Sequence, residues 1–212
     1  MNIGKSLFAT ALIVFASASQ ASTVIKFDAV IGHPNGVAVP NGYYGSSWLG
    51  WTNFHLIEVT NPSWSNSGAV QASVSLPGVA NTDSGLPAQI HSLAPFTLNT
   101  AYFAADWNDG LKVTVSGESE GLIVHTKTFF IDTQHPTLVT FNWQNIDNVL
   151  FSATGGIPNN ALSGAGTNFA MDNLVINGPM SVAPEPETYA MLLAGLGLVG
   201  FMARRRKQIG KS

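Results

Sequence analysis

The side chains that could take part in acid–base or metal chemistry are scattered along this sequence. No two histidines fall within four residues of each other, and no His-Glu-x-x-His segment offers a zinc site. His125 is expected on a strand and His135 in a turn, where the two could approach in space, but the pattern favours solvated surface residues. The histidines are His33, His55, His91, His125 and His135.

Two glutamates have the spacing of a possible glycosidase pair. Glycosidases need two carboxylates about 5–9.5 Å apart in a cleft, one of them with a raised pKa. Glu118 and Glu120 lie between Gly117 and Gly121, and this composition predicts a solvated hairpin tip. We therefore interpret them as a charged turn, and we interpret Asp106 and Asp109, around the preceding turn, in the same way.

A cluster of aromatic residues is the stronger candidate for ligand binding. It lies in a weakly patterned stretch rich in glycine and serine. Exposed rings offer flat apolar faces to sugar C–H groups, while the polar tips of Tyr and Trp form hydrogen bonds. The other interpretation, which we favour, is that these rings fill the hydrophobic core. The cluster contains Tyr43 and Tyr44 together with Trp48, Trp51 and Trp64, the last three being the candidate glycan contacts.

Composition excludes several functional classes. The chain has 212 residues and no cysteine, which rules out disulfides, thiolate catalysis and cysteine-ligated metals. Between Ser22 and Ser181 it has three lysines, no arginine and ten carboxylates, a net charge of −7. Nucleic acid is therefore not an expected partner, because its binding requires clustered basic residues.

The N-terminus has the three parts of a secretory signal. Lys5 supplies the positive charge, and an apolar run from Leu7 to Phe15 follows. Ser19 and Ala21 are small residues at the positions expected before a cut between Ala21 and Ser22. We predict a signal peptide over residues 1–21, which makes the secretion machinery a partner.

The C-terminus has a second arrangement of three parts. A polar linker with three prolines, two of which bracket Glu185, covers residues 179–187, and an uncharged segment, Tyr189 to Ala203, follows it. As a helix this segment is about 22 Å long, short of the ~30 Å hydrocarbon core, but thinning of the bilayer could close the gap. The basic cluster of Arg204, Arg205 and Arg206 should stay in the cytoplasm, which leaves the body outside. We expect a transmembrane helix and its basic cluster within residues 188–207.

This tail resembles the PEP-CTERM sorting signal of Gram-negative bacteria. The resemblance rests on Val182-Ala183-Pro184-Glu185-Pro186, the apolar segment and the three arginines. It implies recognition by an exosortase-type membrane protease, cleavage near Pro184-Glu185-Pro186, and release or attachment at the surface. Such proteins typically occur in bacteria that make exopolysaccharide or biofilm, so exopolysaccharide is a possible partner.

The body, residues 22–178, has the two-residue period of β-strands. We predict strands over residues 23–30 and 70–76, and later over residues 138–143, 149–152 and 169–176. Asn108-Asp109-Gly110 predicts a tight turn between residues 101–107 and 111–116, and residues 117–121 turn the chain into a strand over 122–131. These three strands are expected to form a meander within an all-β, two-sheet sandwich.

Residues 96–176 are similar to jelly-roll modules often found in front of this sorting tail, and the closing strand resembles the last strand of many carbohydrate-binding jelly rolls. The similarity lies in Asp109–Val115, Phe141–Asp147 and Phe169–Ile176. It implies a jelly-roll-like β-sandwich, and such modules often hold a structural calcium near terminal aspartates, here Asp28 and Asp172. Calcium binds carboxylate and carbonyl oxygens. No other cofactor is expected.

These features predict an exported, exosortase-sorted protein of the cell envelope or extracellular matrix, held transiently by its C-terminal helix. Its body is expected to be a non-catalytic structural or glycan-contacting module. Two alternatives remain open: a polysaccharide-active hydrolase, and a protein anchored permanently in the inner membrane.

Overall fold

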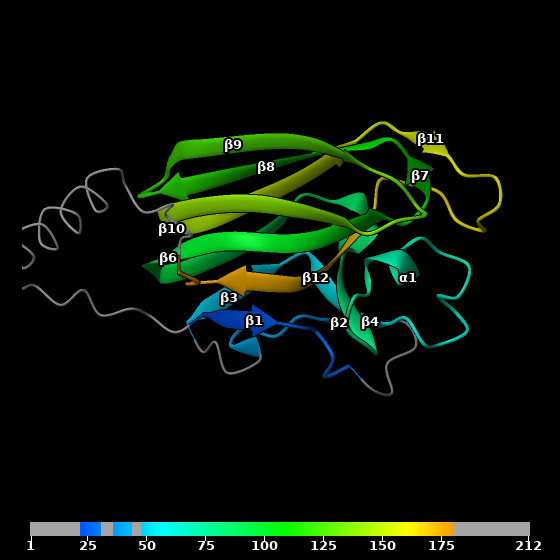
Figure 1. Ribbon diagram of the computed structural model, residues 1–212, viewed down its shortest axis with the longest axis horizontal. Coiled ribbons are helices and arrows are strands. Elements are labelled where there is room, and N and C mark those ends of the chain that lie inside the picture. Colours follow the sequence, from blue (N-terminus) through cyan, green and yellow to red (C-terminus); the bar gives the residue numbers. More distant parts are fainter. Residues whose placement is uncertain (1–21, 31–35, 44–47, 180–212) are drawn as a thin grey trace, which may run out of the picture. The chain divides into compact units, whose positions relative to one another are not determined.

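The computed structural model describes residues 22–30, 36–43 and 48–179 (Figure 1). The chain divides into two compact units, Met1–Pro179 and Met180–Ser212. The expected signal peptide, the Pro-Glu-Pro motif, the C-terminal helix and the arginine cluster all lie outside the described residues. Within the described ranges, no helix has the length and apolar character needed to cross a bilayer.

Nearly all of the regular structure in the described part of the chain is β-strand. The strands are β1 (Thr23–Ile25), β2 (Val37–Ala38), β3 (Leu49–Thr52), β4 (Phe54–Glu58), β5 (Gly78–Thr82), β6 (Ala88–Ala105), β7 (Asn108–Asp109), β8 (Leu111–Ser119), β9 (Leu122–Ile131), β10 (Thr137–Thr154), β11 (Ile157–Pro158) and β12 (Phe169–Ile176). A short helix, α1 (Ala69–Ala72), and a 3-10 turn, η2 (Asp83–Gly85), complete the set.

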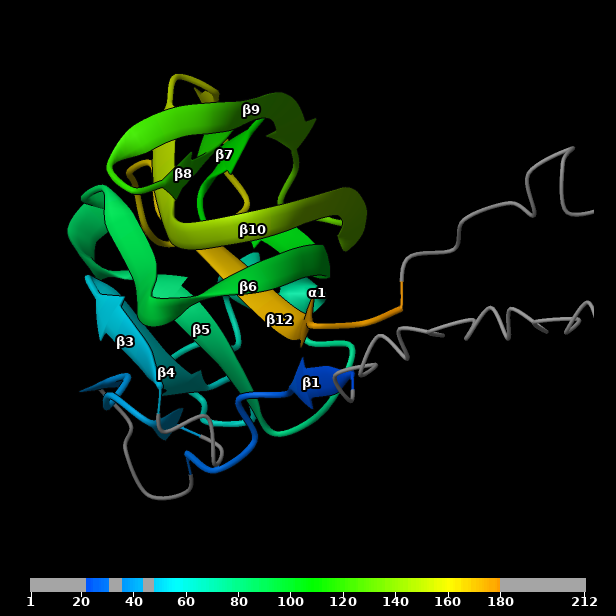
Figure 2. The ribbon, with the colours of Figure 1, turned by 90° about the vertical axis from the view of Figure 1, so that its left-hand side faces the viewer.

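Two long strands, β6 and β10, join the layers of a sandwich (Figure 2). The first half of β6 pairs with β3 and with the second half of β10. This half of β10 pairs with β8, and β8 pairs with β9. The second half of β6 pairs with β12 and with the first half of β10. Beyond β12, this layer continues through β5 and β4 to β2. The expected all-β sandwich is confirmed.

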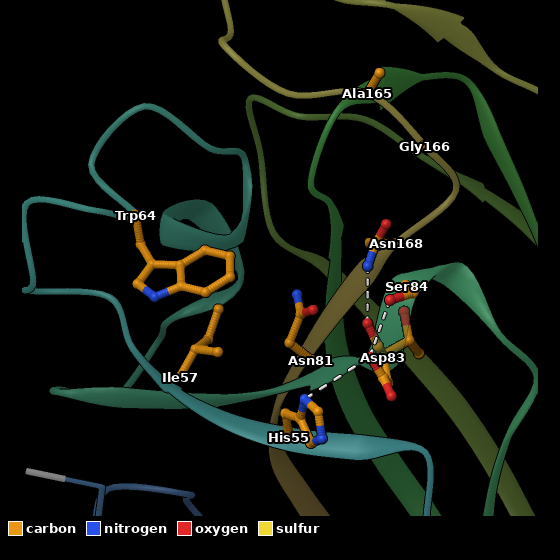
Figure 3. Close-up of a pocket in the computed structure, with 10 residues that line it drawn as sticks. His55, Ile57, Trp64, Asn81, Asp83, Ser84, Ala165, Gly166 and Asn168 are labelled. Atoms are coloured by element: carbon orange, nitrogen blue, oxygen red, sulfur yellow. Dashed lines mark hydrogen bonds and ion pairs between the residues drawn. The ribbon is translucent and has the colours of Figure 1, made fainter. Parts of the chain in front are cut away.

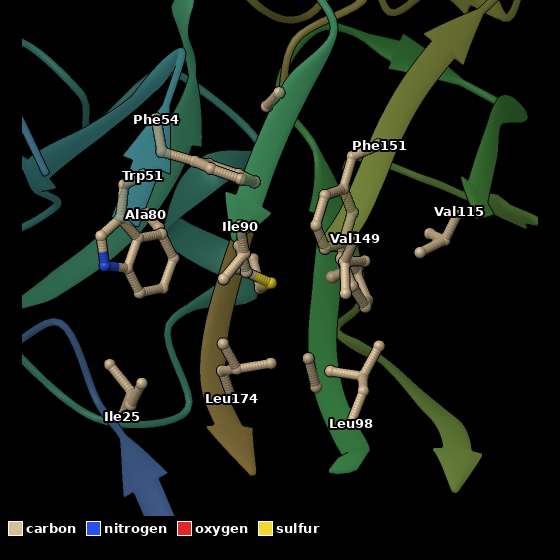
Figure 4. Packing of buried hydrophobic residues seen from close by; sticks show 14 of the residues in the cluster. Ile25, Trp51, Phe54, Ala80, Ile90, Leu98, Val115, Val149, Phe151 and Leu174 are labelled. Carbon is tan, nitrogen blue, oxygen red and sulfur yellow. The ribbon is translucent and has the colours of Figure 1, made fainter. Parts of the chain in front are cut away.

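Aromatic rings fill the space between the layers (Figure 4). Phe54 of β4 meets Phe151 of β10 edge-to-face with ring centroids 5.4 Å apart, and Phe103 of β6 lies 5.1 Å from Phe129 of β9. Each pair joins opposite layers. Burial of large apolar rings is the main stabilising term for such a core.

A second, smaller apolar cluster lies on the other face of the layer that contains β4, β5 and β12. Alternation along β5 turns Val79 away from the main core and Ala80 into it. α1 covers this outer face with Ala69 and Ala72, and Trp64 packs against the same cluster. The outer face is therefore partly covered, and the candidate site lies beside this cover.

The hairpin of β8 and β9 is confirmed. Its strands pair antiparallel from Leu111↔Ile131 to Ser119↔Leu122. Glu120 and Gly121 both have positive φ, 53° and 78°, as a tight hairpin turn requires.

The predicted pairing of residues 101–107 with residues 111–116 is wrong. β10 lies between β6 and β8 and pairs with both. The turn itself exists, with Gly110 at a φ of 68°, but it leads the chain across the sandwich, and Asn108–Asp109 pairs with β11. A turn motif indicates a reversal of the chain but does not fix which strand becomes the neighbour.

The strands predicted over 138–143 and 149–152 are one strand, β10. Register shifts interrupt its pairing with β6 between Thr140 and Asn148. Asn142 and Asn145 take positive φ values of 55° there, which asparagine tolerates better than most residues. These irregularities let one strand serve both layers.

The strand predicted over 70–76 is also wrong, since the segment begins with α1 and continues as bends. The backbone amides of Val74 and Ser75 donate to the side chain of Asp172, at 2.9 and 2.7 Å, instead of to a neighbouring strand. Similarly, the strand predicted over 23–30 ends at Ile25, and Phe27 has a φ of 62°.

Candidate functional site

A pocket of about 460 Å³ opens on the outer face, beside the segment that carries Trp64 (Figure 3). This size is within the range of small-ligand sites. Its lining residues include an aromatic ring, aliphatic groups, two amides, a carboxylate, an imidazole and two hydroxyls. The lining residues are His55, Ile57, Trp64, Asn81, Thr82, Asp83, Ser84, Ala165, Gly166 and Asn168.

Trp64 forms one wall of the pocket, facing the side that carries Asp83, Ser84 and Asn168 (Figure 3). Hydrogen-bonded turns hold its backbone, because Trp64 N donates to Asn61 O at 3.0 Å and Ser67 N donates to Trp64 O at 3.0 Å. The ring also packs against the outer apolar cluster. The indole is therefore fixed in place while part of it remains accessible.

Two neighbouring strands supply the polar floor. His55 of β4 and Asn81 of β5 are direct register partners, so their side chains share a face. The Asn81 amide is oriented from behind, since Nδ2 donates to Asp106 Oδ2 at 2.7 Å. Asn168 is oriented similarly by donation from Nδ2 to Thr82 O at 2.8 Å.

The carboxylate of the pocket belongs to Asp83 in η2. Ser84 Oγ donates to Asp83 Oδ1 at 3.0 Å, and His55 Nδ1 lies 4.0 Å from the same oxygen. Asp83 and His55 remain 39% and 36% exposed, so both can meet a ligand. With histidine neutral, the lining has a formal charge of −1.

The wall at residues 165–168 is held by packing. A Cβ on Gly164 would lie 2.5 Å from the Trp107 ring, so only glycine allows this close approach. Asn159 N donates to Trp107 O at 2.8 Å and fixes the start of the same loop. Trp107 thereby positions the loop that carries Ala165, Gly166 and Asn168.

Asp106 lies behind the pocket and is not the solvated turn residue that we expected. It is 1% exposed, and its Oδ1 has no hydrogen-bond partner. Burial raises the pKa of Asp106 to about 7, and the hydrogen bond from Asn81 opposes this shift. Asp109 is tied to Thr133, whose hydroxyl donates to it at 2.7 Å and helps to lower its pKa.

The three candidate tryptophans do not share one groove. Trp51 is 7% exposed and lies in the main core, edge-to-face with Phe27 and Phe54. Trp48 is 37% exposed and lies against Phe96 at 5.8 Å. Of the three, Trp64 is the one that lines the pocket. The core interpretation therefore applies to Trp51.

Asp28 and Asp172 are brought together on the same side of the body. β1 pairs with β12, so the first and last strands are neighbours. Ser75 Oγ lies 3.3 Å from Asp28 Oδ1 and 3.2 Å from Asp172 Oδ2. Burial raises the pKa of Asp172 to about 6; hydrogen bonds from Ser75 and Asn173 lower it, and the nearby charge of Asp28 raises it.

This group of oxygens fits a hard cation. Ser75 Oγ also lies 3.4 Å from Lys26 O and 3.2 Å from Asn173 Oδ1. A hydroxyl has one proton and can donate to only one of these oxygens, while the backbone N–H groups of Val74, Ser75 and Asn173 donate to the carboxylate of Asp172. Calcium takes six to eight oxygens from such groups. The described residues contain no set of three His, Cys, Asp or Glu side chains placed to hold a metal, so neutral oxygens would complete this set.

The remaining candidates for chemistry lie apart from the pocket. Glu118 accepts a hydrogen bond from Asn148 Nδ2 at 2.7 Å, and Glu120 is at the exposed hairpin tip. Residues 117–121 spell Gly-x-Ser-x-Gly, but they join two strands instead of a strand and a helix, so they are not a nucleophile elbow. His125 stacks on Trp143 at 5.2 Å, while His135 lies near Asp132.

Sequence reasoning did not identify most of this pocket. His55, Asn81, Asp83 and Asn168 come from segments that are far apart in sequence, and no short motif connects them. The pairing of β4 with β5 and of β5 with β12 brings them together. The only local indication was the aromatic cluster that contains Trp64.

Comparison with known proteins adds information mainly about the tail. Residues 182–207 match the model of the PEP-CTERM protein-sorting motif. No curated protein matches the chain.

Several solved structures resemble the body at low identity. A DUF4465 family protein from Bacteroides caccae is 14% identical with a TM-score of 0.45, the match covering 78% of this chain and 90% of that one. TmCBM61 in complex with β-1,4-galactotriose is 10% identical with a TM-score of 0.37, covering 69% and 96%. A DUF4465 family protein from Bacteroides ovatus is 9% identical with a TM-score of 0.44, covering 76% and 95%.

The described residues and the matched tail together define the organisation of the chain. An all-β sandwich precedes a segment with the order Pro-Glu-Pro, apolar span and basic cluster. The chain thus carries a PEP-CTERM protein-sorting motif at residues 182–207, which implies export and exosortase-mediated localisation to the cell envelope or the extracellular space.

Proposed function

We propose that the exported body is a non-catalytic, glycan-contacting component of the envelope or extracellular matrix. The observation that carries this proposal is the pocket, in which the Trp64 ring faces a set of polar side chains. An indole face and several hydrogen-bonding groups in one concavity suit a sugar, which has apolar C–H faces and a rim of hydroxyl groups.

The number of carboxylates in the pocket favours binding over hydrolysis. Asp83 is the single carboxylate among the lining residues. A glycosidase of either stereochemistry uses two, about 5–9.5 Å apart. Asp106 is buried behind Asn81 and is not part of the lining, so it does not supply the second.

The two ends of the chain fit a matrix or envelope location. We propose that the signal peptide is removed before Ser22 and that an exosortase-type protease cuts near Pro184-Glu185-Pro186, after transient anchoring by the C-terminal helix. The adjacent β1 and β12 place the start and the end of the described body close together.

We also propose that calcium binds at Asp28 and Asp172, with Ser75, Asn173 and the carbonyl of Lys26. The crowding of acceptors around Ser75 Oγ supports this. The cation would join the segments before β2, after α1 and in β12. Its role is structural, because none of these residues lines the pocket.

The glycan proposal is tested by equilibrium binding of the exported protein to a panel of neutral, amino and acidic oligosaccharides. At least one should bind, and Trp64→Ala should abolish that binding. Trp48→Ala is the matched control, because it removes a partly exposed indole outside the pocket. Failure of the whole panel, or equal loss in both variants, would contradict the proposal.

A further inference from the structure

The polar groups of the pocket are not balanced between donors and acceptors. The amino group of Asn81 donates to Asp106 Oδ2, and that of Asn168 donates to Thr82 O. Each amide thus uses one of its two amino protons within the protein and keeps its oxygen and the second proton for a ligand. The Ser84 hydroxyl proton is directed to Asp83. The lining therefore presents more acceptors than donors to an occupant.

The negative charge of the pocket also favours a ligand that donates hydrogen bonds and carries positive charge. Asp83 gives the lining a formal charge of −1, and the body around it has a net charge of −7 between residues 22 and 181. No lysine or arginine lines the pocket. An anionic sugar such as a uronate would meet like charge, whereas a cation would be attracted.

The Trp64 ring completes a site that suits an ammonium group. The face of an indole attracts cations through its negative π-system, and a nearby carboxylate adds to this attraction. Figure 3 shows the Trp64 ring on one side of the pocket, with Asp83 and Ser84 on the other and Asn81 between them. A sugar that fills the pocket therefore has the ring on one side and the acceptors on the other.

We infer that the pocket takes a glycan unit with a free amino group, such as a glucosamine residue of a deacetylated polysaccharide, in preference to neutral, N-acetylated or acidic sugars. This inference rests on the proposed glycan-contacting function and specifies its ligand. The ammonium donates to Asp83 and the amide oxygens, and an apolar sugar face lies on Trp64. N-acetylation removes the charge and adds a carbonyl that opposes the acceptors of the pocket.

Calorimetric titration of the exported protein with a β-1,4-linked glucosamine trimer and its fully N-acetylated counterpart tests this directly. The glucosamine trimer should bind at least about tenfold more tightly, which corresponds to about 1.4 kcal/mol. Asp83→Asn should abolish this difference while keeping the shape of the side chain.

Glu120→Gln is the matched control, because it removes one exposed carboxylate at the tip of the β8–β9 hairpin. Glu120→Gln should leave the affinities for the glucosamine trimer and for its N-acetylated counterpart unchanged. An effect equal to that of Asp83→Asn would show that the protein attracts the amino sugar through its net charge alone, and would overturn the inference. Equal binding of the two trimers, or Trp64-dependent binding of neutral or N-acetylated sugars only, would also overturn it while leaving the glycan proposal intact. Absence of binding to every sugar would contradict both.

Discussion

Asn81 donates a hydrogen bond from Nδ2 to Asp106 Oδ2 over 2.7 Å, so an amide that lines the pocket is held by a carboxyl group buried behind it. The other oxygen of that carboxyl group has no partner. Deprotonation of Asp106 therefore leaves a charge in an apolar setting with one hydrogen bond to stabilise it.

We expect the stability of the body to fall as the pH rises through the range that Asp106 titrates. Its pKa is about 7 in the folded protein against 3.8 ordinarily. Between about pH 4 and pH 7 the folded protein keeps a proton that the unfolded chain has lost, so the free energy of unfolding decreases with pH and levels off above. The full change is at most on the order of 4 kcal/mol.

Chemical denaturation of Asp106→Asn at several pH values checks this. The variant keeps the shape and loses the charge, so its stability should vary less between pH 5 and pH 8, and at pH 8 it should exceed that of the wild type. An unchanged pH dependence would show that other groups control it.

Contacts between residues close in sequence could be predicted, whereas pairing between distant strands could not. The β8–β9 hairpin follows from glycines and alternation within about twenty residues, and β12 was predicted with the bounds that the structure has. The insertion of β10 between β6 and β8 was not predictable, because these pairings join residues 30 to 63 positions apart. The pocket depends on the same kind of long-range pairing, which no local pattern of residues encodes.

The sequence did not show which tryptophans are buried and which are exposed. Trp51 and Trp48 lie three residues apart in the same glycine-rich stretch, yet Trp51 is in the core and Trp48 is 37% exposed. Register against β6 makes the difference, because it turns Trp51 toward Phe27 and Phe54.

Replacing these two residues should therefore have unequal effects on stability. Trp51→Ala leaves a cavity in the core and should cost about 3–5 kcal/mol. Trp48→Ala should cost much less, since its ring is partly solvated. Urea denaturation of the two variants measures the difference, and equal losses would contradict the placement of these rings.

Calcium should stabilise the body through the cluster around Ser75. A ligand at one hundred times its dissociation constant adds about 2.7 kcal/mol, which raises the Tm of a protein of this size by about 5–10 °C. The measurement compares thermal unfolding with calcium and with chelator. Asp28→Asn and Asp172→Asn should remove the response, and Glu120→Gln should retain it. A response in all variants would place the calcium elsewhere, and no response in the wild type would refute the site.

Sorting should depend on the tail in two separable ways. Replacing Pro184, Glu185 and Pro186 with alanine should leave full-length protein in the inner membrane, because the processing enzyme no longer reads its motif. Changing Arg204, Arg205 and Arg206 to serine should instead weaken retention before cleavage, since these charges orient the segment. Cell fractionation with intact-mass measurement distinguishes the two. Identical fractionation and mass for the wild type and the Pro-Glu-Pro variant would contradict processing at this motif.

The most direct test of glycan contact at Trp64 without hydrolysis is saturation-transfer NMR on the exported protein with a bound oligosaccharide. We predict that the sugar ring protons receive saturation from the wild type and from Trp48→Ala but not from Trp64→Ala, and that the oligosaccharide stays intact throughout. Equal transfer in Trp64→Ala, or new reducing-end signals that grow with time and protein concentration, would contradict the account.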